Sequence, residues 1–181
     1  MIRKLENTMI ETLKLLADYN MKADAAMMKI LSALPEESLR KDLGTFFKSI
    51  ADTLLHAAAA EIIWLKRFKG FLRFECLGKS PLPGMTNEEL MDICAKDLRS
   101  FFTLKGRIDE LYIALVAEIR AEDLGRRIRY TSVSGREMEK TFWHTIMQVL
   151  NHGTHHRGAI SAMLDILKVD NDYSGIVLYT E

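Results

Sequence analysis

The sequence predicts an all-α protein, a four-helix bundle with a long connection between its second and third helices and a small β-hairpin before its fourth. Apolar residues recur at spacings of three and four over four long stretches, which is the pattern of amphipathic helices. Glycine and proline concentrate between the second and third of these stretches, and β-branched and aromatic residues interrupt the pattern before the fourth. A chain of 181 residues can bury a sizeable core as one domain, so we expect a single domain over residues 1–181.

The first predicted helix covers residues 3–34, because no proline occurs before Pro35. Pro35 followed by two glutamates is typical of a helix start, since proline lacks only an unneeded amide donor there and acidic side chains favour a helix N-terminus. We therefore expect the second helix to begin close to Pro35 and to run to residue 69. A long irregular connection should follow over residues 70–87, because this stretch contains the helix breakers Gly70, Gly78, Pro81, Pro83 and Gly84.

The third helix is predicted to begin after an N-cap at Thr86 or Asn87 and to continue as one helix to about residue 119. Residues 126–133 then carry β-branched and aromatic side chains before the pair Ser134-Gly135, and a polar stretch follows to residue 140. Such a pair suits a tight turn, so this segment predicts a hairpin inserted between helices.

The fourth helix is predicted over residues 141–167. We expect the tail, residues 168–181, to lie across the bundle as an extended segment.

Composition argues against partners that are recognised by bulk charge. Lysine plus arginine is 25 and aspartate plus glutamate is 25, a net charge of zero, so we expect neither nucleic acid nor a membrane surface as partner. No signal peptide is recognisable, and the least polar stretch, residues 54–65, is too short to span a bilayer. Cys76 and Cys94 form no CxxC motif, which suits a reducing cytoplasm.

Three of the five histidines lie in the segment from residue 151 to residue 158, within the fourth predicted helix. A helix turns about 100° per residue, so with His152 at zero the apolar face of this helix is centred near 70° and His156 lies at about 40°. His155, at about −60°, and His144, at about −80°, point away from that face. His152 and His156, at i and i+4, can therefore converge on one point.

The third ligand of a metal centre would have to come from another helix, and His56 in the second helix is the candidate. It lies at the edge of an apolar face that this helical reading assigns to Phe46, Ile50 and Trp64. The three histidines His56, His152 and His156 are thus predicted to bind a divalent metal ion. Histidines satisfied by backbone carbonyls and water are the alternative for each one taken alone. Gly153 stands where an HExxH protease motif needs its glutamate, which disfavours that chemistry.

Other polar residues have less specific interpretations. Asp52 and Glu61 either orient an imidazole or are solvated helix charges, and we favour the second. We expect Arg157 to pair with a carboxylate rather than to bind an anionic substrate. The basic run Arg126-Arg127-Ile128-Arg129 is interpreted as a solvated edge of the hairpin rather than a nucleic-acid site.

The string Asn151-His152-x-x-x-His156-Arg157-Gly158, preceded by Thr141-Phe142-Trp143 and paired with a histidine in the second helix, resembles the DinB/YfiT-like superfamily. The resemblance covers nearly the whole chain. It implies a four-helix bundle, commonly dimeric, with a divalent metal held by histidines that match His56, His152 and His156. Gln148 and Ala159 depart from the family pattern, in which histidine and glutamine are frequent at these two positions.

The resemblance also implies a function, because family members include small-thiol-dependent transferases and isomerases alongside metal-dependent hydrolases. Three neutral imidazoles would leave a divalent ion its charge and an open position, so that it could activate a water or a thiol. Zinc, nickel and iron all suit imidazole. We therefore expect a metal-dependent thiol transferase or hydrolase acting on a small molecule, as a homodimer. The alternative is a non-catalytic metal-binding or dimeric interaction protein.

Overall fold

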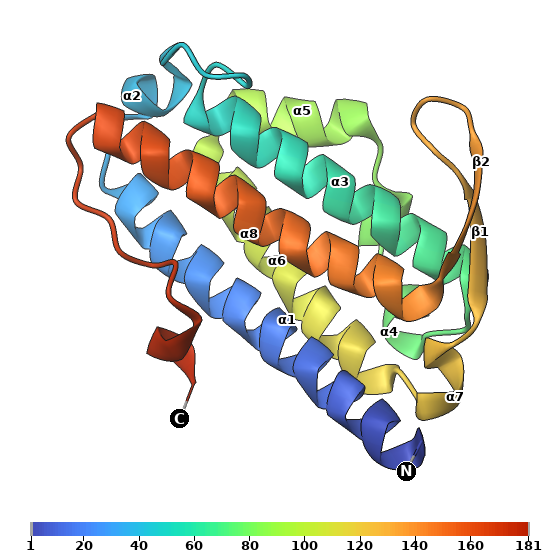
Figure 1. Cartoon of the computed structure of the whole chain (residues 1–181). Coiled ribbons are helices and arrows are strands. Elements are labelled where there is room, and N and C mark those ends of the chain that lie inside the picture. The colour runs from blue at the N-terminus through green and yellow to red at the C-terminus, as the bar shows by residue number, and fades with distance from the viewer. Residues whose placement is uncertain (1, 181) are drawn as a thin grey trace.

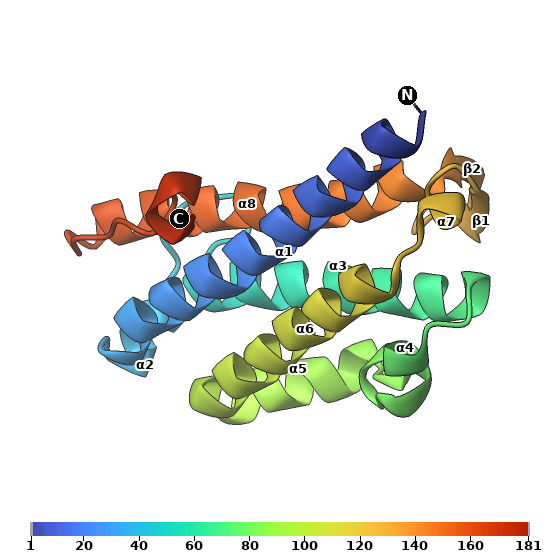
Figure 2. The same cartoon turned by 90° about the horizontal axis from the view of Figure 1, so that it is seen from below.

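A computed structural model describes residues 2–180 of the chain, with the side chains of residues 5–180. Four long helices form a bundle: α1 (Ile2–Ser32), α3 (Ile50–Phe71), α6 (Leu98–Glu118) and α8 (Phe142–Ile166). Helix α1 contacts α6 and α8, and α3 contacts the same two helices, so that each long helix has two long neighbours (Figures 1 and 2). The predicted bundle and the hairpin before its last helix are confirmed. The four helices share one core, to which they contribute Leu13, Met27, Ile50, Leu65, Phe101, Ile108, Ile146 and Leu164.

A helix begins directly after Pro35, as predicted, but it does not run on to residue 69. A short helix, α2 (Glu36–Arg40), follows α1, and α3 begins only at Ile50. Between them residues 41–49 form a tight turn in which Gly44 and Lys48 have positive φ angles of 73° and 66°, which a helix does not allow. The Lys48 amide donates to the Thr45 carbonyl at 2.9 Å, and the Leu43 amide donates to the Lys48 carbonyl at 2.8 Å. Phe46, predicted on the apolar face of this helix, is instead in the turn and 91% exposed.

The predicted third helix is two helices, α5 (Asn87–Lys96) and α6, which meet at Asp97 and pack against each other (Figure 2). Asp97 adopts an extended conformation with φ −162°, and its carboxylate accepts hydrogen bonds from the amides of Arg99 and Ser100, each at 3.0 Å. It therefore caps α6 and ends α5. Thr86, one of the two predicted caps, caps α5 in a reciprocal pair of hydrogen bonds with Glu89.

The predicted long connection between α3 and α5 is present but not wholly irregular. It contains α4 (Glu75–Lys79) and a single 3₁₀ turn, η1 (Leu82–Gly84). Leu77 and Leu82 are buried in the common core, which explains why a segment rich in helix breakers is ordered.

The hairpin consists of β1 (Arg127–Thr131) and β2 (Glu137–Thr141), paired antiparallel with Arg127 opposite Thr141, and follows the short helix α7 (Ala121–Leu124). The Tyr130 ring lies against the Trp64 ring of α3 with a centroid distance of 5.0 Å. Arg67 stacks on both rings. These contacts hold the hairpin at one end of the bundle (Figure 1). Arg127 and Arg129 are exposed and pair with Glu139, as expected for a solvated edge.

The C-terminal tail crosses α1, but the prediction of an extended segment holds only in part. Residues 169–175 contain neither helix nor strand, and a 3₁₀ turn, η2 (Ile176–Tyr179), follows. The Tyr19 hydroxyl of α1 donates to the Ser174 carbonyl at 2.6 Å. The Tyr173 side chain of this segment is buried, and its hydroxyl donates to the Arg157 carbonyl of α8 at 3.1 Å, which fixes the segment to the bundle.

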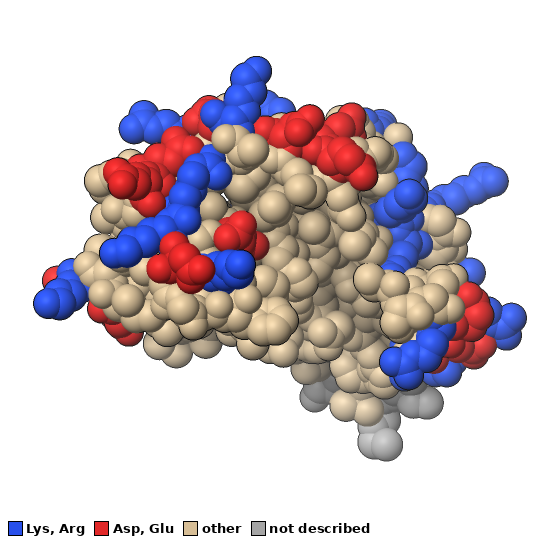
Figure 3. All heavy atoms as spheres, turned by 90° about the horizontal axis from the view of Figure 1, so that it is seen from above, with Lys and Arg blue, Asp and Glu red and all other residues tan. Residues whose placement is uncertain are grey.

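The surface carries charges of both signs. Figure 3 shows basic and acidic side chains gathered mostly toward the edges of one face, with an uncharged area near its centre. Within residues 2–180 no helix has the length and apolar character that crossing a membrane would require.

Candidate metal centre

The three histidines predicted as ligands lie together. His56 projects from the second turn of α3, where it is exposed, and His152 and His156 project from successive turns of α8. A ring nitrogen from each lies within 4.8 Å of one from each of the others. The Nε2 atoms of His152 and His156 are 3.0 Å apart. The prediction that His152 and His156 share one face of their helix and converge on one point is therefore confirmed.

This arrangement fits a small divalent ion. A tetrahedral ion with bonds of about 2.0–2.1 Å to nitrogen holds its ligand atoms about 3.3 Å apart. The spacing in the cluster, from 3.0 Å between two nitrogens to the 4.8 Å limit for all three, brackets that value. Small side-chain rotations would therefore complete the geometry, without movement of either helix.

The electrostatics of the cluster favour the form of imidazole that binds metals. Burial, followed by the proximity of His152 and His56, lowers the pKa of His156 to about 3. Burial and the neighbouring histidines also lower the pKa of His152 and of His56. All three rings are thus neutral at pH 7, with lone pairs available for a cation.

The two other histidines lie outside the cluster, as their helical positions predict. His155 is exposed, and its ring lies 4.9 Å from the His156 ring without joining the group of donor atoms. His144 is exposed beside Trp143.

Phe47 is the neighbour of the cluster that sequence reasoning missed. Its ring stacks on the His56 ring, with a centroid distance of 4.4 Å and an interplanar angle of 30°, and it meets the edge of the His156 ring at 5.5 Å. It comes from the turn over residues 41–49, which the helical interpretation did not contain. This turn covers one side of the cluster and leaves a pocket of about 490 Å³ against the three imidazoles.

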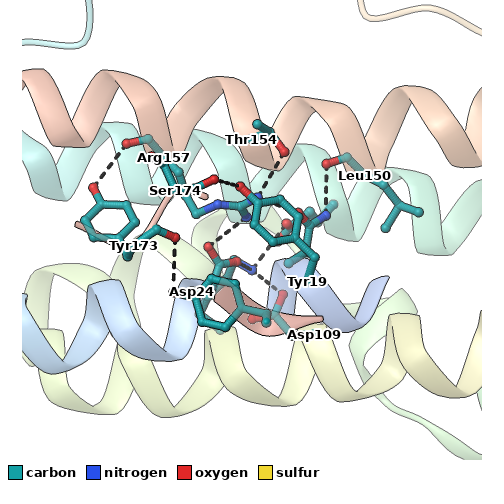
Figure 4. A network of polar contacts seen from close by, with 12 residues as sticks. Tyr19, Asp24, Asp109, Leu150, Thr154, Arg157, Tyr173 and Ser174 are labelled. Atoms are coloured by element: carbon teal, nitrogen blue, oxygen red, sulfur yellow. Dashed lines mark hydrogen bonds and ion pairs between the residues drawn. The ribbon is translucent and has the colours of Figure 1, made fainter. Parts of the chain in front are cut away.

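Arg157, next to the ligand candidate His156, points the other way, into the core (Figure 4). Its Nη1 lies 3.1 Å from a carboxylate oxygen of Asp24, and its Nη2 donates to Asn20 and to the Thr154 hydroxyl. The Asn20 side chain in turn donates to the Leu150 carbonyl of α8 at 2.9 Å. The predicted pairing with a carboxylate is confirmed. Gly153 lies beside this arginine, and a Cβ there would be 3.4 Å from Nη1 of Arg157, about van der Waals contact.

A second cluster of carboxylates, Asp24, Glu61 and Asp109, lies in the core. The Lys105 ammonium already occupies its centre, 2.6 Å from Asp24, 3.3 Å from Glu61 and in short contact with Asp109. The three carboxylates raise the pKa of Lys105 well above its ordinary value despite the opposing effect of burial. A fixed cation thus stands where a metal would, and we assign this cluster no metal. The sequence indicates this cluster only through charged residues that fall on the otherwise apolar faces of the helices.

Neither proposed partner of the imidazoles contacts them. Asp52 is exposed and accepts a hydrogen bond from the Ser49 hydroxyl at 2.5 Å. Glu61 is buried in the ionic cluster, so its interpretation as a solvated charge is wrong. Among the residues that the structure describes, the Nδ1 atoms of His152 and His156 are buried without a hydrogen-bond partner. The two α8 imidazoles are therefore positioned by helix geometry and packing.

The chain matches a known family model. The family model described as DinB family matches residues 9–167, which contain all four long helices except the first residues of α1, as well as the hairpin and the three histidines. The chain therefore belongs to the DinB family.

A named relative supports this assignment. The chain is 29% identical over 150 residues to Protein DinB of Bacillus subtilis (strain 168), and the match covers 82% of each chain.

Proposed function

We propose that this protein is a metal-dependent enzyme, a small-thiol transferase or a hydrolase, whose divalent ion is held by His56, His152 and His156. One observation carries the proposal: three neutral imidazoles from two helices bring their donor atoms within 4.8 Å of one another beside an accessible pocket. A site that served only structure would be closed by a fourth protein ligand. In the described residues the group of candidate ligands at this position contains three.

A divalent ion with three neutral ligands acts as a Lewis acid, which lowers the pKa of a water or thiol at its open position. The chain's own residues set the conditions for this chemistry. The Nε2 atoms of His152 and His156 converge on one point, 3.0 Å apart, and the Phe47 ring packs on the His56 ring. The buried Arg157 anchors the same turn of α8 to α1.

The protein's own thiols are poorly suited to act as the nucleophile. Burial, followed by the contact with Glu118, raises the pKa of Cys76 to about 12, and burial raises the pKa of Cys94. Neither residue lines the pocket at the histidines. Transfer to an electrophile would therefore use a thiol supplied as a co-substrate.

Metal binding is the first test. Protein purified without a nickel column and stripped with a chelator is titrated with Zn²⁺ and Co²⁺, as wild type and as His56→Ala, His152→Ala and His144→Ala. We expect one ion per wild-type chain and at least 100-fold weaker binding in the first two variants. His144→Ala, an exposed histidine on the same helix as His152, serves as the control and should bind as the wild type does.

Turnover is the second test. The loaded protein is screened with small thiols against alkyl and epoxide electrophiles, and with activated esters for hydrolysis. Thiol- or water-dependent turnover that disappears in His152→Ala supports the proposal. Equal metal content in wild type and His152→Ala would refute the metal site. A tightly bound metal without any turnover would instead favour a non-catalytic metal-binding protein.

A further inference from the structure

The pocket beside the three histidines is apolar, and its walls come from two separate parts of the chain. Besides the three imidazoles, its lining consists of Thr45, Phe46 and Phe47 from the turn over residues 41–49 and of His155, Ala159, Ala162 and Met163 from α8. No aspartate, glutamate, lysine or arginine lines it. Its volume of about 490 Å³ lies within the usual range of small-molecule sites.

A second cleft, of about 450 Å³, lies on the other side of His152 and differs in chemistry. It runs toward the hairpin and is lined by Lys140, His144 and Gln148 together with the rings of Trp64 and Tyr130. His152 is the residue that lines both spaces. A ligand at the histidines can therefore place one part against the apolar wall and another beside the Lys140, His144 and Gln148 side chains.

We infer that the pocket formed by Phe46, Phe47, Ala159, Ala162 and Met163 binds an apolar group of the substrate, an aromatic ring or a branched alkyl chain, next to the reacting atom. The inference rests on the proposed function, because the three imidazoles form the wall that this group would face. A cavity of about 150 Å³ is enough to hold benzene, so this pocket has room for a ring and its attachment.

Ala159 and Ala162 set the size of the pocket. They are three residues apart on α8, so their methyl groups lie on one face of the helix beneath the same space. Both side chains retain solvent access, and leucine at either position would extend into the pocket rather than into the core. These two alanines are thus specificity-determining residues, and Ala159 is one of the two positions where the sequence departs from the family pattern.

The test compares two azoles that bind metals through the same nitrogen. Imidazole and 4-phenylimidazole are titrated into Co²⁺-loaded protein, and binding is followed by the visible spectrum of the ion. We expect wild type to bind 4-phenylimidazole at least tenfold more tightly than imidazole, because the phenyl ring leaves water for the apolar pocket. Ala159→Leu and Ala162→Leu should reduce this preference below threefold at the Co²⁺ content of the wild type.

The matched control is Ala25→Leu, which places the same substitution at an exposed alanine of α1 outside the pocket. It should retain the full preference for 4-phenylimidazole. Leucine is a good helix former, and an unchanged melting temperature shows that each variant is folded. If Ala159→Leu and Ala162→Leu retain the wild-type preference, or if wild type shows none, the inference is overturned.

A metal-free arm separates this inference from the proposed function. Toluene is added to stripped protein, and the methyl resonances of Ala159, Ala162 and Met163 are followed by NMR. Selective, saturable shifts of these resonances in wild type and in Ala25→Leu support the apolar pocket even if the protein binds no Co²⁺, a result that would refute the proposed function alone. Absence of such shifts while Co²⁺ binds would refute the pocket and leave the metal site standing.

Discussion

At the scale of single residues, two buried cations pair with buried carboxylates that belong to other helices of the bundle. Lys105 on α6 holds carboxylates of α1, α3 and its own helix, while Arg157 on α8 shares Asp24 with it. Three carboxylates against two cations leave a formal charge of 2 − 3 = −1, and burial raises the pKa of Glu61. The buried network therefore depends on each cation, since removing one leaves carboxylates without compensation.

Lys105→Met tests this dependence. We expect it to lower the free energy of unfolding by about 3–5 kcal/mol, because the apolar replacement fills the space but removes the cation that pairs with Glu61 and Asp109. Urea denaturation followed by circular dichroism measures the change. Arg107→Met, an exposed cation two residues further along α6, is the control and should change stability by less than about 0.5 kcal/mol. Equal effects of the two substitutions would contradict the role of Lys105.

At the scale of elements, helix ends decide where the sequence prediction succeeds and fails. The sequence offers two N-caps for α5, Thr86 and Asn87. The cap in the structure is Thr86, whose hydroxyl accepts a hydrogen bond from the Glu89 amide at 3.2 Å. The end of α5 was missed because the apolar pattern continues on both sides of Asp97, and only the cap marks the break.

Thr86→Ala removes this cap and should destabilise the protein by about 1 kcal/mol, because the Glu89 amide loses its acceptor. Asn87, the other residue that the sequence offers as an N-cap, is in the first turn of α5. Asn87→Ala should therefore change stability little. Thermal denaturation of both variants provides the comparison. If Asn87→Ala lost more stability than Thr86→Ala, Thr86 would not be the cap of α5.

The faces of the long helices, the hairpin and the three histidines could be predicted because they depend on local spacing, which the sequence displays directly. In the turn over residues 41–49, Gly44 is a signal that the sequence does contain, but Lys48 also has a positive φ angle, which a lysine does not indicate. The position of Phe47 depends on that turn, so one wall of the candidate site was also hidden. The sequence shows charged residues on the buried helix faces, but it does not show which of them pair, because most partners lie far apart in the chain.

At the scale of the whole molecule, the two thiols report on the packing of the fold. Cys94 is buried and Cys76 is half-buried, and the pKa of Cys76 is raised to about 12 by burial and by Glu118. At pH 8 a thiol with that pKa is ionised in roughly one molecule in ten thousand. Both thiols should therefore react very slowly in the native protein.

Labelling with iodoacetamide at pH 8 checks this expectation. We expect native protein to label at least 100-fold more slowly than protein in denaturant, where both thiols regain an ordinary pKa near 8.5. The native rate should rise with pH toward 12, since the thiolate fraction increases tenfold per unit below the pKa. Free glutathione, labelled in parallel, controls for the reagent. Native labelling as fast as that of glutathione would contradict the burial of these groups.

The adjacency of His156 and Arg157 fixes how α8 is set in the bundle. One residue faces the pocket and the next reaches Asn20 and Asp24 on α1. A helix that rolled about its axis to improve one contact would pull the other away, because neighbouring side chains are about 100° apart around the helix. Substitutions that remove the contacts of the buried arginine should therefore let α8 rotate and misalign the imidazoles, although they do not contact them. The packing of the core thus also fixes the geometry of the pocket.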